Sequence, residues 1–188
     1  MLADHNSRFS VEEVLRGYFH AKDENRPVLL DRVFTSNAEV VIHNKSANIA
    51  FPAATHGRSA IAEVLVRSFA LAYENVYSFY LARPSGNVKE FECPWLVGMS
   101  ERESGAARVG CGTYTWSFES GPPQLARSLV ISIETMQVAP LREFEEVFAW
   151  LRALGYPWSS CSLALSGIPK TESLAPVAAF LERHVTVA

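Results

Sequence analysis

The sequence predicts one α+β domain in which helices come first and a sheet follows. Between residues 10 and 72, apolar residues recur at helical spacing, interrupted by one short run rich in β-branched residues. From residue 73 to residue 139 the pattern changes to strand-like runs, separated by clusters of Gly, Pro, Ser and Asn that favour turns. A length of 188 residues suits a single domain with a substantial core.

The first helix has the clearest signals. Ser10 and Glu13 form a capping-box pattern at its start. Apolar residues then follow at positions i, i+3, i+4 and i+7 of one helical face: Val11, Val14, Leu15 and Tyr18. The polar run 22–26 is expected to end this helix, and Pro27 is well placed in the first turn of a second, short one.

A strand and a third helix are expected next. Residues 39–43 are rich in β-branched side chains, which favours a strand. A loop containing Pro52 and Gly57 leads to a helix whose apolar face includes Ile61, Leu65 and Phe69.

Four strands are expected to form an antiparallel meander, because the connections between them are short. The candidate strands are residues 76–83, 91–102, 107–118 and 127–138. In the third of them, Gly110 and Gly112 share a face with Tyr114 and Trp116. Paired glycines on one strand face indicate strong bending or the close approach of another backbone.

The C-terminal segment, residues 140–188, is expected to pack against the rest of the domain. It is too rich in aromatic residues for a disordered tail. Residues 141–154 and 176–184 have helical patterns, and Gly155 is suited to ending the first of these helices.

Composition and charge exclude several classes of function. A net charge of −3 and a pI near 6.0 leave no basic footprint for nucleic acid or an anionic membrane. The three cysteines are widely spaced, which predicts neither a disulfide framework nor a zinc site. The first nine residues are polar and no apolar run reaches spanning length, so a cytoplasmic location is expected.

Three segments carry a family resemblance: residues 17–20 (GYFH), 38–43 (AEVVIH) and 56–61 (HGRSAI). They resemble the opening helices and first strand of SnoaL-like and ketosteroid-isomerase-like proteins of the nuclear-transport-factor-2-like superfamily. The resemblance covers residues 8–139, so we expect a domain over 1–139 with residues 140–188 as a helical extension. It implies a cone, in which a strongly bent antiparallel sheet wraps the N-terminal helices around an apolar pocket.

The resemblance also implies two catalytic candidates. Tyr18 matches the tyrosine that donates a hydrogen bond to the oxyanion in ketosteroid isomerases. His43 ends the first strand, near the position of their proton-abstracting aspartate, and could act as the base. The chain has only three aspartates and none lies on a predicted strand, which argues against steroid isomerisation. The alternatives are a core tyrosine and a solvated histidine.

Four further residues are candidates for ligand binding. His56 lies in the loop expected at the mouth of the pocket. Tyr114 and Trp116 are candidates for its lining, with plain core packing as the alternative. Glu134 is a candidate carboxylate inside the cone, with a solvated sheet face as the alternative. His43 and His56 lack a third ligand at a recognisable spacing, so no metal is expected, and neither is a cofactor.

Two functions of different class remain open. One is an enzyme that moves a proton, dehydrates or cyclises a small apolar substrate bearing a carbonyl group, as an isomerase, dehydratase or cyclase. The other is a non-catalytic module for binding a hydrophobic ligand or for dimerisation. The resemblance also implies a homodimer through the face of strand 127–138 that carries Val130, Met136 and Val138.

Overall fold

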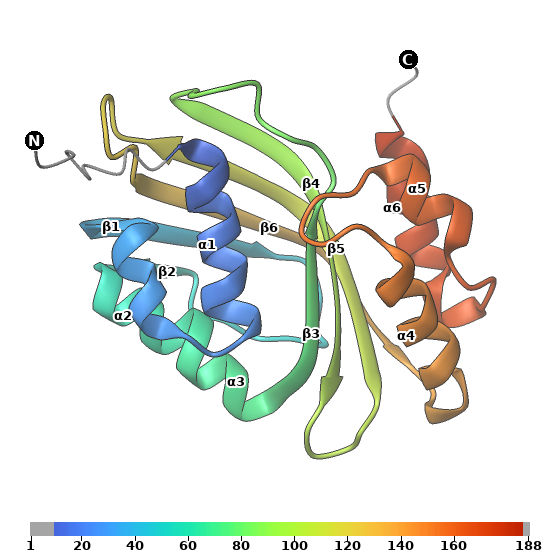
Figure 1. Ribbon diagram of the computed structural model, residues 1–188. Coiled ribbons are helices and arrows are strands. Elements are labelled where there is room, and N and C mark those ends of the chain that lie inside the picture. The colour runs from blue at the N-terminus through green and yellow to red at the C-terminus, as the bar shows by residue number, and fades with distance from the viewer. Residues whose placement is uncertain (1–9, 186–188) are drawn as a thin grey trace, which may run out of the picture.

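The computed structural model describes residues 10–185, with the helices on both sides of one curved sheet (Figure 1). The N-terminal helical elements are α1 (Val11–Asp23), the 3-10 helix η1 (Pro27–Arg32), α2 (Arg58–Ala62), the π-helical η2 (Glu63–Ser68) and α3 (Phe69–Ala72). The strands are β1 (Phe34–Asn44), β2 (Ala54–His56), β3 (Tyr73–Tyr80), β4 (Glu90–Glu101), β5 (Ala107–Phe118) and β6 (Ala126–Ala139). The C-terminal helical elements are η3 (Leu141–Glu143), α4 (Phe144–Ala153), α5 (Cys161–Gly167), η4 (Glu172–Leu174) and α6 (Ala175–His184).

The sheet confirms the predicted α+β cone. Its strand order is β2-β1-β6-β5-β4-β3, so the last four strands form the expected antiparallel meander. The first strand, β1, joins the meander by pairing in parallel with β6, and the short strand β2 adds an antiparallel edge that the sequence did not predict. The sheet curves around α1, α2 and α3 (Figure 1).

Helix α1 begins where its sequence predicts. The Ser10 hydroxyl accepts a hydrogen bond from the Glu13 amide at 3.2 Å, and the Glu13 carboxylate accepts one from the Ser10 amide at 2.7 Å. The bond from the Ser10 amide, together with one that the Ser10 hydroxyl donates to the carboxylate at 3.0 Å, lowers the pKa of Glu13 below its usual range. The buried face of the helix extends past Tyr18 to Lys22, which was expected to be part of a polar end.

A glycine in β5 and a bulge in β6 shape the inner face of the sheet. A Cβ atom at Gly112 would lie 1.8 Å from the Ser132 carbonyl oxygen, so only glycine fits there; of the two alternatives that the paired glycines left open, Gly112 shows the close approach of another backbone. The register of β5 against β6 shifts at this point: Gly112 pairs with Ile133, whereas Cys111 pairs with Thr135, which leaves a bulge in β6 between them. Ile133 and Met136 therefore both face the inner core, whereas strict alternation had placed Met136 on the outer face.

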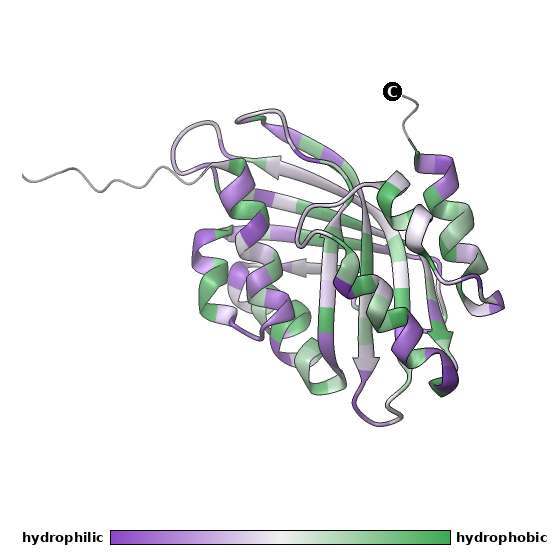
Figure 2. Cartoon of the chain, turned by 45° about the vertical axis from the view of Figure 1, so that its right-hand side comes forward, coloured by the Kyte–Doolittle hydropathy of each residue, from purple (hydrophilic) through white to green (hydrophobic). Residues whose placement is uncertain are grey.

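The C-terminal segment packs across the outer face of the sheet, as a second apolar layer. Helices on both sides of the sheet carry hydrophobic and hydrophilic stripes (Figure 2). The outer core joins α4–α6 to sheet residues of β3–β6, which include Phe79, Leu96, Val109, Cys111 and Ala139. A Cβ atom at Gly98 would lie 2.1 Å from Leu151 Cδ1, so this glycine leaves room for α4 to approach the sheet. The sequence did not predict α5.

The segment also covers the edge strand β3. The Tyr80 amide donates to the Pro157 carbonyl at 2.8 Å, and the Ser159 amide donates back to the Tyr80 carbonyl at 2.9 Å. The Trp158 ring stacks on Tyr80, with 4.9 Å between ring centroids, and belongs to the inner core. The segment therefore contacts the sheet at both its outer face and its edge. No helix within residues 10–185 has the length and apolarity to cross a membrane.

Candidate functional site

A pocket opens on the concave side of the sheet. It lies between α1, the helix formed by η2 and α3, and the inner faces of β1, β4, β5 and β6. Its cavity volume is about 50 Å³, and all the empty space including the open mouth is about 470 Å³. Its lining residues are Tyr18, Lys22, Ile42, Ile49, Phe51, Leu65, Phe69, Trp95, Val97, Met99, Tyr114, Ile131, Ile133 and Met136. Most of these side chains are apolar, so the pocket suits a small hydrophobic molecule.

The π-helical turn η2 helps to build this wall. Leu65 lies inside it and Phe69 follows it directly, and both line the pocket. A π-helical turn inserts one residue into a helix and rotates the residues beyond it, a feature often found at functional sites. The sequence predicted the helix and these two apolar residues but gave no sign of the π-helical turn.

Two tyrosines supply hydroxyl groups to the pocket. Tyr18 from α1 and Tyr114 from β5 meet edge to face, with ring centroids 6.2 Å apart, and the Tyr114 phenol donates a hydrogen bond to that of Tyr18. Tyr114 also stacks on Trp95, whose indole Nε1–H is buried without a hydrogen-bond partner among the described residues. Buried phenol and indole groups usually have polar partners, and the Tyr114 hydrogen is already engaged with Tyr18, so the Tyr18 hydroxyl and the Trp95 indole are the donors suited to an oxygen on a ligand.

Burial holds these phenols in the neutral form. Loss of solvent raises the pKa of Tyr18 far above its usual value of 10.0; the nearby Asp23 charge adds to the rise and the Tyr114 hydrogen bond opposes it. The pKa values of Tyr114 and Tyr80 are raised well above 10.0, again chiefly by burial. At neutral pH the pocket tyrosines are therefore hydrogen-bonding groups without charge.

These shifts predict unfolding in alkali. Because the folded-state pKa values of Tyr18, Tyr80 and Tyr114 exceed 10.0, the folded chain holds three protons that the unfolded chain loses above that pH. Their contribution to stability is complete below pH 10 and falls by about 1.4 kcal/mol per tyrosine for each pH unit above it. We expect tyrosinate absorbance and loss of circular dichroism to appear together in one transition. Tyrosinate formation near pH 10 in a chain that stays folded would contradict this.

A buried ion pair lies at the pocket wall, at the end of α1. Lys22 Nζ lies 2.6 Å from Asp23 Oδ1, and the two side chains are 8% and 2% exposed. Lys22 also donates to the Ser78 hydroxyl at 2.8 Å and lies 4.7 Å from the centroid of the Phe69 ring. The lysine therefore borders both the apolar pocket and a polar network.

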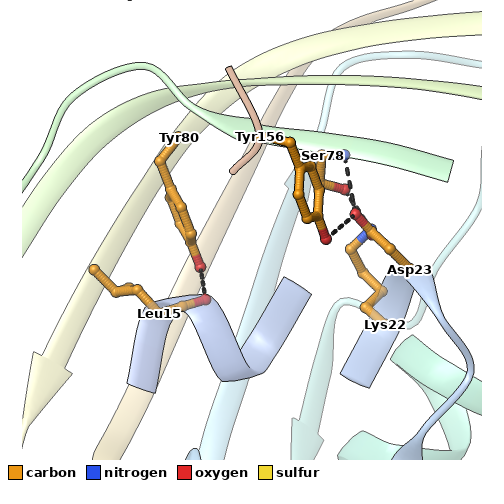
Figure 3. A network of polar contacts seen from close by, with 6 residues as sticks. All are labelled: Leu15, Lys22, Asp23, Ser78, Tyr80 and Tyr156. Atoms are coloured by element: carbon orange, nitrogen blue, oxygen red, sulfur yellow. Dashed lines mark hydrogen bonds and ion pairs between the residues drawn. The ribbon is translucent and has the colours of Figure 1, made fainter. Parts of the chain in front are cut away.

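Asp23 is the centre of that network (Figure 3). Its carboxylate accepts hydrogen bonds from the Ser78 amide at 3.0 Å, from the Ser78 hydroxyl at 2.8 Å and from the Tyr156 hydroxyl at 3.3 Å. Tyr156 belongs to the C-terminal segment, so this segment contacts the residue that pairs with Lys22. Close by, the Tyr80 hydroxyl donates to the Leu15 carbonyl at 2.9 Å and ties β3 to α1 (Figure 3).

The structure brings only some of the predicted site residues together. Tyr18 and Tyr114 line the pocket, and Trp116 is fully buried behind them, with its ring centroid 5.2 Å from that of Tyr18. His43 is exposed, next in β1 to the pocket-lining Ile42 and therefore on the opposite face of the strand. Tyr18 and His43 consequently do not face a common cavity.

His56 and Glu134 also lie outside the pocket. His56 is exposed on β2, where its ring Nε2 lies 3.6 Å from Glu39 Oε1. Glu134 is on the outer face and forms ion pairs with Lys45 at 2.7 Å and with Arg183 at 3.7 Å. The hydrogen bond from Lys45 lowers the pKa of Glu134. Within residues 10–185, no group of three His, Cys, Asp or Glu side chains could hold a metal ion.

The residues that the sequence reasoning missed are Lys22 and its partners. Lys22 lies four positions after Tyr18, so it continues the apolar stripe of α1, and this spacing was a usable signal. Asp23 and Ser78 are distant in sequence and meet only through the packing of α1 on β3. Nothing in the local sequence marks that contact.

Comparison with known proteins shows the fold. No family model matches the chain, and no curated protein matches it in sequence. A nuclear transport factor 2-like superfamily protein from Salmonella enterica serovar Typhimurium has a similar solved structure, with a TM-score of 0.51 and 14% identity over 64% of this chain and 85% of its own. A type 2 hexachlorocyclohexane dehydrochlorinase is similar, with a TM-score of 0.52 and 12% identity over 70% of this chain and 87% of its own.

At these sequence identities the similarity shows a shared backbone fold and gives no information about a substrate. It agrees with the predicted order of helices and meander. The chain therefore has the fold of the nuclear-transport-factor-2-like superfamily.

Proposed function

We propose that this protein binds a small, neutral, mostly apolar molecule that carries one oxygen acceptor. The observation that supports this most directly is the pair of buried, neutral phenols, Tyr18 and Tyr114, inside an otherwise apolar pocket. Apolar lining supplies the affinity of such sites, and a few polar groups fix the orientation of the ligand. A carbonyl or hydroxyl oxygen would accept from the Tyr18 phenol or from the Trp95 indole.

The charges at the site favour a neutral ligand. Lys22 is the cationic residue of the lining, and its charge is matched by Asp23 at 2.6 Å. An anionic ligand would have to compete with this buried carboxylate, and burying a charge without a partner costs several kcal/mol.

Binding is better supported than catalysis by proton transfer. No aspartate, glutamate or histidine is among the lining residues of the described pocket. The isomerase, dehydratase or cyclase hypothesis needs a group that takes up a proton. It relied on His43, which is exposed on the far face of β1. Tyr18 keeps a role in this proposal as a hydrogen-bonding group for the ligand.

Tyr18→Phe tests the proposal with two matched ligands, cinnamyl alcohol and its hydrocarbon analogue trans-β-methylstyrene. Losing one hydrogen bond should weaken binding of the alcohol about 2- to 10-fold, the equivalent of about 0.5–1.5 kcal/mol, and leave the hydrocarbon unaffected. Quenching of tryptophan fluorescence reports binding, because Trp95 lines the pocket.

The matched control is Tyr77→Phe, which removes a hydroxyl from the outer core and should change neither affinity. Tyr18→Phe itself should change the free energy of unfolding by no more than about 1–2 kcal/mol. Failure of both ligands to bind the unaltered protein would refute the proposal.

A homodimer remains a prediction, but its apolar contact surface on β6 is smaller than the sequence suggested. Met136 faces the pocket, which leaves Val130 and the exposed Val138 of the predicted patch. The C-terminal helices cover the part of the outer face around Leu96 and Val109. We expect sedimentation at tens of micromolar to show a dimer that Val130→Lys dissociates. A monomer under these conditions would contradict it.

A further inference from the structure

Lys22 places a primary amine at the wall of an apolar pocket. The residue is 7% exposed, lines the pocket, and lies over the ring of the pocket residue Phe69 at 4.7 Å. Lysine amines in hydrophobic pockets are the groups that condense with carbonyl compounds in proteins. The chain has three other lysines, Lys45, Lys89 and Lys170, and all three are exposed.

Asp23 is fixed in the position that this chemistry requires. Its carboxylate contacts Lys22 Nζ at 2.6 Å, and its orientation is held by the Ser78 amide, the Ser78 hydroxyl and the Tyr156 hydroxyl. With a side chain 2% exposed, it is positioned to exchange a proton with the amine and to balance a positive charge there.

We propose that Lys22 captures an apolar aldehyde as a protonated Schiff base, with Asp23 as the counter-ion. The inference rests on the proposed function, because the aldehyde must enter the same pocket. Tyr18, one helical turn before Lys22 on the same face of α1, is placed to donate a hydrogen bond to the carbonyl oxygen.

The reaction balances within the ion pair. Asp23 takes one proton from the ammonium group, and the free amine attacks the carbonyl carbon to form a C–N bond. A second proton moves from nitrogen to oxygen, giving a neutral carbinolamine beside the protonated Asp23. Asp23 then returns its proton to the hydroxyl group, which leaves as water while the nitrogen lone pair forms the C=N bond. An ammonium–carboxylate pair and an aldehyde become an iminium–carboxylate pair and water, without an oxidant, a reductant or a net proton.

Cinnamaldehyde with sodium cyanoborohydride tests this on the intact protein at neutral pH, because reduction fixes the imine as a stable secondary amine. Peptide mass spectrometry then compares modification of Lys22 with that of the exposed Lys45, Lys89 and Lys170. We expect Lys22 to react about tenfold faster or more, since the pocket holds the aldehyde beside the amine. Excess cinnamyl alcohol should slow modification at Lys22 alone.

Lys22→Arg is the matched variant, because it keeps a cation beside Asp23 and cannot form an imine. It should lose the fast modification and keep its circular dichroism spectrum. Modification spread over the three exposed lysines, with Lys22 slower than they are, overturns the Schiff base. If cinnamyl alcohol still binds in that case, the proposed function stands and the imine alone fails; if Lys22 is trapped but the alcohol neither binds nor slows the trapping, the aldehyde does not reach Lys22 through the proposed site and both proposals fail.

Discussion

Replacing Asp23 with alanine is expected to lower the free energy of unfolding by about 3–5 kcal/mol. The substitution leaves the Lys22 ammonium group, 8% exposed, without its carboxylate. It also removes the acceptor of the Ser78 and Tyr156 hydrogen bonds. Urea unfolding followed by circular dichroism and by tryptophan fluorescence measures the loss.

The control for this prediction is the double variant Asp23→Ala, Lys22→Met. It removes the charge that the single variant leaves unpaired, so it should be more stable than Asp23→Ala alone. Exposed ion pairs contribute about 0–1 kcal/mol, and a loss within that range for Asp23→Ala would show that water reaches the pair.

Removing residues 141–188 is expected to have the largest effect of all. It uncovers the apolar outer face of the sheet at Phe79, Leu96, Val109 and Cys111, together with the unpaired edge of β3 beside Tyr80. Exposed patches and edges of this kind drive aggregation. Light scattering and binding of a hydrophobic dye should both rise sharply for the truncated chain.

Two point variants test whether buried contacts of the C-terminal segment, rather than its length, stabilise the domain. Leu151→Ala empties a fully buried position of α4 and should cost about 2–5 kcal/mol, whereas Leu163→Ala alters a side chain of α5 that is half exposed. The second should stay within about 0.5 kcal/mol of the unaltered protein. A truncated chain that stays soluble with an unchanged melting temperature would mean that the segment is an independent appendage.

The fold was predictable because its signals are local. The capping box at Ser10 and Glu13 started α1 at the right residue, and the turn clusters separated the four meander strands. The parallel pairing of β1 with β6 and the short strand β2 were not predictable, because both depend on contacts between distant segments.

The site was predictable only in part, for two physical reasons. The prediction for β6 assumed that side chains alternate between the two faces of a regular strand. The bulge in β6 breaks this alternation and turns Met136 to the inner face. Resemblance placed His43 near the position of a catalytic aspartate, but the alternation along β1 turns its side chain away from the pocket. The pocket-lining positions of Tyr18 and Tyr114 were predictable because the helix and the strand that carry them are regular there.

The hydrogen bond from Tyr156 to Asp23 has a consequence for the whole chain. Asp23 contacts Tyr156 of the C-terminal segment and Lys22 of the pocket wall. Docking of Tyr156 on Asp23 and binding of a ligand beside Lys22 are therefore two equilibria of one thermodynamic cycle. In such a cycle, coupling is reciprocal. A ligand whose affinity rises when Tyr156 is docked on Asp23 must favour that docked state by the same factor. Occupancy of the pocket would then be detectable as slower amide hydrogen exchange around residue 156, on the far side of the β3 edge.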